Sequence, residues 1–167
     1  MMAAQPKLAI RPFLPTDAPL LAEIFRASIE ELTGEDYNEA QQQAWASLAA
    51  DEEAFACRLS DGLTLLGTVD GSPVGFASLT GKERLDMLYI HPAAIGQGVG
   101  SMLVDALERL AAARGAGKLT AEVSDSAMDF FRRRGFVPQQ RNSVPIAGEW
   151  LANTTMQKQL AAKGRPQ

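Results

Sequence analysis

The segment between Arg84 and Arg114 constrains the fold most, because it contains a strand, a glycine-rich loop and a helix in direct succession. The run RLDMLYI is largely apolar and suits a buried strand, which Pro92 would end because it has no N–H to donate. After the loop, apolar residues recur at helical spacing, which predicts one amphipathic helix that ends at Gly115. This succession favours a domain that combines strands and helices.

Three glycines lie at alternate positions between that strand and that helix, namely Gly96, Gly98 and Gly100. Because glycine has no Cβ, the backbone there can approach a ligand closely and present its N–H groups. Such N–H groups and the positive end of a helix form an anion site, usually for phosphate. The plainer interpretation is a tight turn in which the glycines only close the connection. The spacing differs from the dinucleotide pattern Gly-x-Gly-x-x-Gly, and no Gly-Lys-Ser/Thr follows, which excludes a nucleotide-triphosphate P-loop.

Local patterns predict the other elements, in the order β-α-α-β-β-β-α-β-α-β-β. Strands are expected at 8–13, 63–69, 73–79, 84–90 and 119–123, from Phe136 onward, and at 150–160. Helices are expected after Asp17, after Asn38 and at 127–134, and residues 52–59 form a short helix or a turn. The dipeptide Asp70-Gly71 predicts a hairpin between the second and third strands.

Length and composition limit the domain organisation and the partners. At 167 residues we expect one domain, with a core at about 8–160 and a frayed tail at 161–167. The net charge of −4, without a long basic run, argues against nucleic acid as a partner. Without an apolar leader or a stretch of about 18 apolar residues, we expect no signal peptide, no membrane contact and a cytoplasmic location. Cys57 is the only cysteine and no metal-ligand cluster stands out, so we expect neither an internal disulfide nor a metal.

The glycine loop resembles that of the GCN5-related N-acetyltransferases (GNAT), which reads Arg/Gln-x-x-Gly-x-Gly/Ala and binds the pyrophosphate of acetyl-coenzyme A. Gly98 and Gly100 match this pattern, whereas Ile95 stands where the family usually has Arg or Gln. Gln97, two positions later, offers a substitute donor. The resemblance extends over nearly the whole chain. It implies that the coenzyme contacts the loop residues Ile95, Gly96, Gln97, Gly98, Val99, Gly100 and Ser101.

A second stretch, AMDFFRRRGF at 127–136, resembles the family pattern Ala-x-x-Phe-Tyr-x-x-x-Gly-Phe. The Tyr, which protonates the departing coenzyme thiolate in many members, is replaced here by Phe131. Since Phe131 has no hydroxyl, either another group or water gives that proton, or the chain binds the coenzyme without efficient catalysis. The resemblance implies coenzyme contacts for Phe130 and Phe131, which also suit a packed core. Arg134 is a candidate for contact with a coenzyme phosphate, and a solvated helix end is the alternative.

The central strand carries the remaining candidates. By resemblance, its backbone at Leu88 and Ile90 faces the pantetheine arm, where two strands of the sheet splay apart. Asp86 lies on the same face as Leu88 if the pleat is regular, so it is the first candidate for the base or the amine anchor. Glu122, on the following strand, is the second candidate. Tyr89 is the first candidate for the proton donor to the thiolate and also a coenzyme contact, with plain packing as its alternative.

Two further stretches are candidates for the acceptor side. The acidic stretch 30–37, which includes Tyr37, is either a solvated loop or a wall over a substrate pocket. The polar stretch 142–156 is either a hairpin that packs Trp150 or a source of acceptor contacts such as Asn153.

The residues and the resemblance together predict one α/β domain of the α+β type. Its mixed, mainly antiparallel sheet is splayed in the middle and carries helices on both faces. The predicted activity is acetyl transfer from acetyl-coenzyme A to a primary amine of a small molecule or a peptide, by direct attack in a ternary complex. The alternative is a coenzyme-A-binding module with little or no catalysis, which Phe131 suggests. The identity of the acceptor and the choice between monomer and homodimer stay open.

Overall fold

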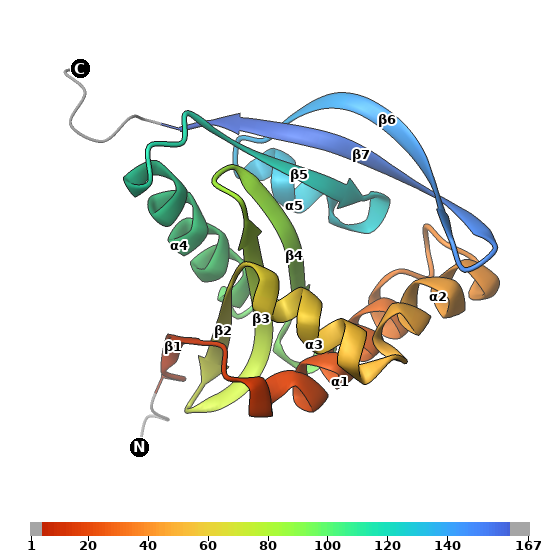
Figure 1. Ribbon diagram of the computed structural model, residues 1–167, viewed down its shortest axis with the longest axis horizontal. Coiled ribbons are helices and arrows are strands. Elements are labelled where there is room, and N and C mark those ends of the chain that lie inside the picture. The colour runs from red at the N-terminus through yellow and green to blue at the C-terminus, as the bar shows by residue number, and fades with distance from the viewer. Residues whose placement is uncertain (1–4, 161–167) are drawn as a thin grey trace.

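The computed structural model describes residues 5–160 and is built on one seven-stranded sheet (Figure 1). The strands lie in the order β1-β2-β3-β4-β5-β7-β6, and every neighbouring pair is antiparallel except β4 and β5. Their bounds are β1 Leu8–Pro12, β2 Leu63–Val69, β3 Ser72–Thr80, β4 Arg84–Ile90, β5 Lys118–Ser124, β6 Val137–Ile146 and β7 Glu149–Gln159. This mixed, mainly antiparallel sheet confirms the predicted fold class.

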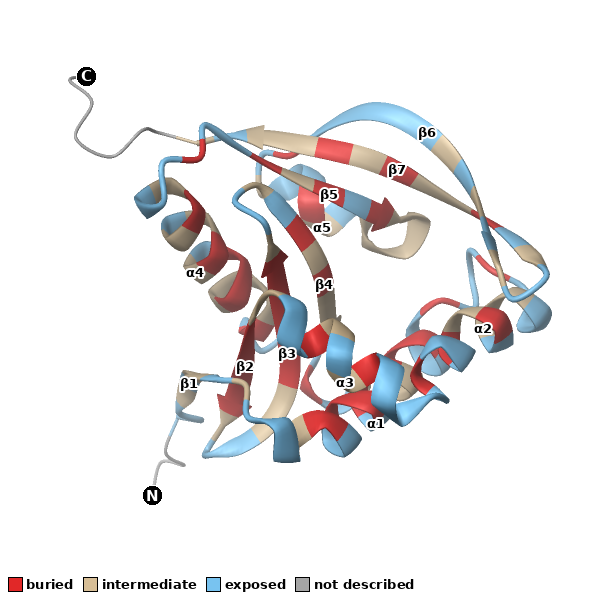
Figure 2. Cartoon of the chain, viewed as in Figure 1, coloured by how far each residue is buried: buried red, intermediate tan, exposed pale blue. Residues whose placement is uncertain are grey.

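The helices divide the apolar core into two clusters, one on each face of the sheet. One cluster includes side chains of α4 (Val99–Ala113) and α5 (Met128–Arg133), and the other those of α1 (Ala18–Leu32), α2 (Glu39–Ala46) and α3 (Glu52–Asp61). Figure 2 shows buried residues concentrated in β2 and β3, whereas β6 is largely exposed. No helix within residues 5–160 is long and apolar enough to cross a membrane.

Several ends of elements form as the local signals predict. The side chain of Asn38 accepts a hydrogen bond from Gln41 N at 2.8 Å, and the side chain of Gln41 accepts one from Asn38 N at 2.9 Å, which begins α2. Asp70 and Gly71 both have positive φ, at 50° and 85°, and turn the chain from β2 into β3. The main difference is α3, a full helix where the sequence predicted a short helix or a turn. It adds a third helix before β2 to the predicted order.

The parallel pair in the middle of the sheet is very short. β4 and β5 are paired only at Leu85↔Ala121 and at the position before it, and then diverge (Figure 1). The register of β4 against β3 shifts at the same level, which leaves Asp86 as the extra residue of a β-bulge. The sheet is therefore splayed from the first residues of β4 onward, as predicted.

Two glycines let the first turn of α4 approach the sheet closely. Gly67 and Gly75 lie opposite each other on β2 and β3. A Cβ on Gly67 would lie 2.6 Å from Val99 Cγ1, and one on Gly75 would lie 2.5 Å from Ile90 Cδ1 and 3.4 Å from Val99 Cγ1. The start of α4 is thus packed on bare backbone, which fixes the position of the glycine loop that precedes it.

The replacement Gly75→Ala is expected to lower the free energy of unfolding by about 1–3 kcal/mol, because the added methyl group overpacks this contact. Urea unfolding followed by circular dichroism measures the difference. Gly117→Ala is the matched control, because a Cβ there meets no atom within 4 Å, and it should change stability by less than about 0.5 kcal/mol. Equal stability of the two variants would contradict the close contact.

Candidate functional site

A cavity of about 530 Å³ opens where β4 and β5 diverge. Its walls are β4 from Leu85 to Ile90, β5 from Ala121 to Ser124, the glycine loop, and parts of α1 and α5. The volume lies within the range of about 300–1,000 Å³ that is usual for small-molecule sites. The opening in the sheet is therefore also the place where the two sequence motifs meet.

The glycine loop presents a row of unpaired N–H groups to this cavity. Gly96 and Gly98 have φ values of 84° and 89°, a left-handed conformation that other residues rarely adopt. Within residues 5–160, no N–H from Gly96 to Ser101 has an acceptor, whereas the next N–H, that of Met102, donates to Gly98 O at 3.0 Å. Together with the dipole of the 15-residue helix α4, these groups form an anion-binding end.

Two phenylalanines form the apolar wall beside the loop. A Cβ on Gly100 would lie 3.4 Å from Phe130 Cζ, so the third glycine allows α4 and α5 to pack closely. Phe131 is only 4% exposed, and its ring meets that of Phe136 edge-on at a centroid distance of 5.0 Å. Phe131 belongs to the core and lines the cavity at the same time. An apolar ring therefore stands where the family pattern that residues 127–136 resemble has a tyrosine.

The open edge of β4 offers backbone donors. His91 N donates to Val74 O on β3 at 2.7 Å. Because N–H groups alternate between the two edges of a strand, those of Leu88 and Ile90 point to the other edge, from which β5 has diverged. These are the two residues whose backbone was predicted to face the coenzyme arm. A carbonyl oxygen placed in this opening would lie beside a hydrogen-bond donor.

Tyr89 belongs to the cluster on the α1 side of β4 and lies at the margin of the cavity. Its ring packs on Phe25 at a centroid distance of 4.6 Å, and its hydroxyl accepts a hydrogen bond from Trp45 Nε1 at 3.2 Å. Burial raises the pKa of the Tyr89 phenol above its ordinary value, so the phenol keeps its proton at neutral pH. Among the described residues that proton has no acceptor, so it is available to a ligand.

A second cavity, of about 150 Å³, adjoins the first between α2, α3 and the β6–β7 hairpin. The residues that line both cavities are Trp45, Asp86, Tyr89, Glu122 and Ser124. The two cavities therefore share a boundary, and ligands placed in them would meet there.

Asp86 turns toward α3 and not toward the face of Leu88. The regular pleat assumed from the sequence is wrong here, because the β-bulge inserts Asp86 between the two alternating faces. Oδ2 of Asp86 accepts a hydrogen bond from Arg58 Nε at 3.1 Å, and Oδ1 accepts one from Arg58 Nη2 at 3.4 Å. Arg84 Nε lies 3.8 Å from the same Oδ1. Guanidinium groups thus engage both oxygens of this carboxylate.

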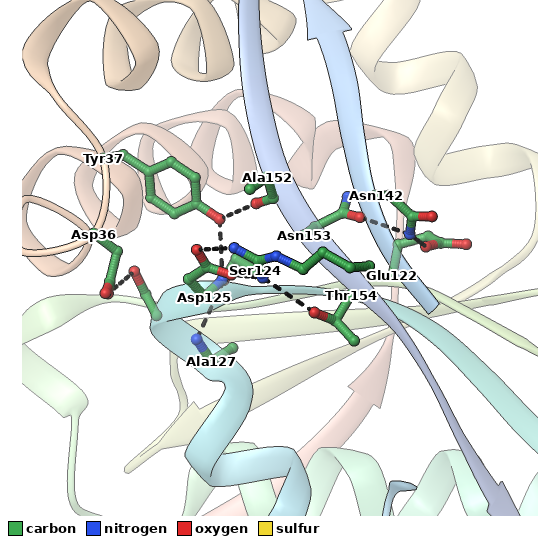
Figure 3. A network of polar contacts seen from close by, with 12 residues as sticks. Asp36, Tyr37, Glu122, Ser124, Asp125, Ala127, Asn142, Ala152, Asn153 and Thr154 are labelled. Atoms are coloured by element: carbon green, nitrogen blue, oxygen red, sulfur yellow. Dashed lines mark hydrogen bonds and ion pairs between the residues drawn. The ribbon is translucent and has the colours of Figure 1, made fainter. Parts of the chain in front are cut away.

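Glu122 keeps one carboxylate oxygen free of the described residues. Its Oε2 accepts hydrogen bonds from Thr155 Oγ1 at 2.7 Å and from Asn142 Nδ2 at 3.1 Å. Asn142 also donates to Asn153 Oδ1 at 3.0 Å, so β6 and β7 together orient the carboxylate (Figure 3). Within residues 5–160, no side chain or backbone group donates to Oε1 of Glu122. That oxygen can accept a hydrogen bond from a ligand at the boundary of the cavities.

Tyr37 joins three segments at the far wall of the second cavity. Its hydroxyl donates to Ala152 O on β7 at 2.5 Å and accepts a hydrogen bond from Asp125 N at 3.0 Å (Figure 3). Asp125 also forms an ion pair with Arg141 of β6, in which Nη2 lies 2.9 Å from Oδ2. Burial raises the pKa of the Tyr37 phenol, so its donated hydrogen bond persists at neutral pH.

Most of the predicted site residues are brought to the larger cavity. These are Asp86, Leu88, Tyr89, Ile90, Ile95, Gly96, Gly98, Val99, Gly100, Ser101, Glu122, Phe130 and Phe131. Gln97 is exposed and does not line the cavity. Arg134 binds the carboxylates of Asp105 and Glu108 on α4, and Arg133 lines the cavity in its place. Within residues 5–160, no group of three or more His, Cys, Asp or Glu side chains could hold a metal ion.

Three residues of the site were not identified from the sequence, namely Trp45, Arg58 and Arg84. Trp45 lies on a well-capped helix, and a tryptophan there is a signal that could have been used. Arg58 carries no local signal, because it lies 28 positions before its partner Asp86 in the sequence. Arg84 approaches the same carboxylate from two positions away on β4. Asn153, for which acceptor contact was one of two interpretations of the sequence, lines the second cavity.

Comparisons with known proteins agree with this geometry. The acetyltransferase (GNAT) domain family matches residues 33–160. The peptidyl-lysine N-acetyltransferase YjaB of Salmonella typhimurium is 31% identical over 129 residues, which are 77% of this chain and 72% of that protein. A GCN5-related N-acetyltransferase structure from Rhodopseudomonas palustris is 59% identical with a TM-score of 0.91, covering 96% of this chain and 99% of that one. The PaiA N-acetyltransferase of Thermoplasma acidophilum, solved with coenzyme A, shares the fold at 19% identity and a TM-score of 0.76, covering 92% of this chain and 99% of that one. This chain therefore belongs to the GNAT family of acetyltransferases.

Proposed function

We propose that this chain transfers the acetyl group of acetyl-coenzyme A to a primary amine by direct attack in a ternary complex. The observation that carries the proposal is the boundary shared by the two cavities, which includes Tyr89 and Glu122. Two ligands that meet at such a boundary are held in position to react with each other. Membership of the family supports the acetyl donor, and so does the coenzyme A bound to the PaiA protein of the same fold.

The larger cavity is the proposed coenzyme site. The N–H groups from Gly96 to Ser101 suit its pyrophosphate, and the exposed Arg133 suits a phosphate at the cavity mouth. The N–H groups of Leu88 and Ile90 suit the thioester carbonyl and the oxyanion that develops from it. This placement brings the thioester to the boundary with the second cavity.

Glu122 is the proposed anchor and base for the amine. Its free Oε1 can accept a proton from an ammonium group, whereas the carboxylate of Asp86 is already engaged by Arg58. After Glu122 takes that proton, the nitrogen forms a bond to the acetyl carbon. The C–S bond breaks, and the sulfur leaves as a thiolate.

Tyr89 is the proposed proton donor to that thiolate. Phe131 cannot take this role, because it has no hydroxyl. The Tyr89 phenol is protonated and lies at the boundary of the two cavities. Its proton has no acceptor among the described residues. The nitrogen loses its second proton as the amide forms, and solvent carries this proton back to the phenol. The products are the N-acetylated amine and free coenzyme A.

A coenzyme-A-binding module with little catalysis is the second candidate, and Phe131 in the core-packed position is the observation that favours it. Release of free thiol from acetyl-coenzyme A in the presence of a library of amines separates the two. Amine-dependent thiol release supports the enzyme. Tight coenzyme binding without any amine-dependent release would favour the binding module.

Gly98→Ala is expected to weaken coenzyme A binding by about tenfold, because a left-handed backbone costs a non-glycine residue about 1–2 kcal/mol and the loop relaxes away from its anion-binding form. Isothermal titration calorimetry with coenzyme A measures the Kd. Gly117→Ala, in open space at an ordinary φ, is the control and should bind as the wild type does. An unchanged Kd for a folded Gly98→Ala protein would exclude the loop as the pyrophosphate site.

Tyr89→Phe is expected to lower kcat by about 10²-fold, the low end for a lost general acid, with little change in the Kd for coenzyme A. Because burial raises the phenol pKa, the wild-type kcat should stay level with rising pH until beyond about pH 10, the ordinary tyrosine pKa. The variant should lack this alkaline limb. Wild-type kcat in the variant would remove Tyr89 from the mechanism.

Glu122→Gln and Asp86→Asn form a matched pair that tests which carboxylate is the base. Glu122→Gln is expected to lower kcat/KM for the amine by about 10²-fold. Asp86→Asn should lower kcat/KM far less, because the carboxylate of Asp86 serves the Arg58 ion pair. The reverse order of the two effects would make Asp86 the base, as the sequence suggested.

A further inference from the structure

One wall of the second cavity carries an excess of positive charge. Arg58 of α3 and Arg84 of β4 both line it, and between them lies the single carboxylate of Asp86. The side chain of Arg84 is 57% exposed, and within residues 5–160 its only anionic contact is the 3.8 Å approach to Asp86. No described group accepts a hydrogen bond from its guanidinium. This wall can therefore take a second anion from a ligand.

A second wall is anionic and polar. It is formed by Glu122 of β5 and Asn153 of β7, and Asn142 lies behind them and holds both in place (Figure 3). Apolar side chains of the hairpin, Val144, Ile146 and Leu151, complete the lining. A ligand that fits both walls has a positive group, a negative group and an apolar part.

The order of these groups along the cavities fixes the orientation of such a ligand. Glu122 lines both cavities, whereas Arg58 and Arg84 line only the second one. An ammonium group at Glu122 would therefore lie next to the thioester, and a negative group would lie within the second cavity, on the side of Arg58 and Arg84. A polyamine would instead bring a second positive charge to two guanidinium groups, which disfavours it.

We propose that the acceptor of this enzyme is a free amino acid, whose amino group binds at Glu122 and whose carboxylate binds at Arg84 and Arg58. This inference rests on the acetyltransferase function proposed above and names its substrate class. Guanidinium groups bind carboxylates through paired, charge-assisted hydrogen bonds, which simple amines and carboxamides cannot form. The volume of about 150 Å³ suits a small molecule with a modest apolar side chain.

The test compares amino acids with two analogues of the same skeleton, the carboxamide and the decarboxylated amine, for example leucine, leucinamide and 3-methylbutylamine. Thiol release from acetyl-coenzyme A gives kcat/KM for each, over a panel of such sets. For the best skeleton we expect the amino acid to exceed both analogues by about tenfold or more, the worth of a hydrogen bond to a charged group. The α-amino group of the carboxamide has a pKa of about 8, like that of a peptide N-terminus. A difference in amine basicity would therefore favour the carboxamide, and it cannot produce a preference for the amino acid over the carboxamide.

Variants of Arg84 connect the preference to the proposed wall. Arg84→Gln should raise KM for the amino acid by about tenfold and leave the two analogues and the Kd for coenzyme A unchanged. Arg84→Lys should retain part of the preference, because it keeps the charge. Arg114→Gln, at an exposed position that lines neither cavity, is the control and should behave as the wild type.

The possible outcomes distinguish a failure of the proposed substrate class from a failure of the acetyltransferase function itself. Acetylation of amines or of lysine-containing peptides without a preference for amino acids overturns the substrate class and leaves the acetyltransferase function standing. A preference that survives Arg84→Gln overturns the assignment to this wall. Absence of acetylation of every amine overturns the acetyltransferase function and the substrate class together.

Discussion

The early divergence of β4 from β5 is the constraint on which the rest of the structure depends. A parallel pair of strands ordinarily continues its ladder of hydrogen bonds, but here the ladder ends at Leu85↔Ala121. Beyond that point the N–H groups of Leu88 and Ile90 face an opening instead of a strand, so the pairing of the sheet leaves them without an acceptor. The fold thus contains a gap in its own hydrogen bonding that a ligand can complete.

Independent packing on the two faces keeps this gap in a defined shape. On one face, Gly67 and Gly75 allow α4 to lie close against the sheet. This contact fixes the position of the free N–H groups at the start of α4 relative to the opening between β4 and β5. On the other face, the rings of Phe25 and Trp45 hold Tyr89 at the margin. The anion-binding loop and the phenol therefore depend on separate cores, and neither has to move for the other to be in place.

Features with a local cause could be predicted from the sequence, and those that depend on pairing between distant strands could not. The left-handed glycines of the loop, the Asn38 cap and the Asp70-Gly71 turn each follow from the backbone preference of the residue itself. The side to which Asp86 turns depends on a shift in the pairing of β3 with β4, which no residue near Asp86 encodes. Arg134 has the same difficulty, because α4 supplies its carboxylate partners from a different part of the chain.

The hydroxyl of Tyr37 is a single oxygen atom that ties the segment after α1 to β7 and to the turn after β5. The wall that it secures surrounds the second cavity, while the larger cavity is formed by the glycine loop, β4 and α5. The wall therefore depends on contacts among all three of these segments. Residues of the β6–β7 hairpin line only the second cavity, so sequence changes in the hairpin can reshape that cavity while the larger one keeps its lining.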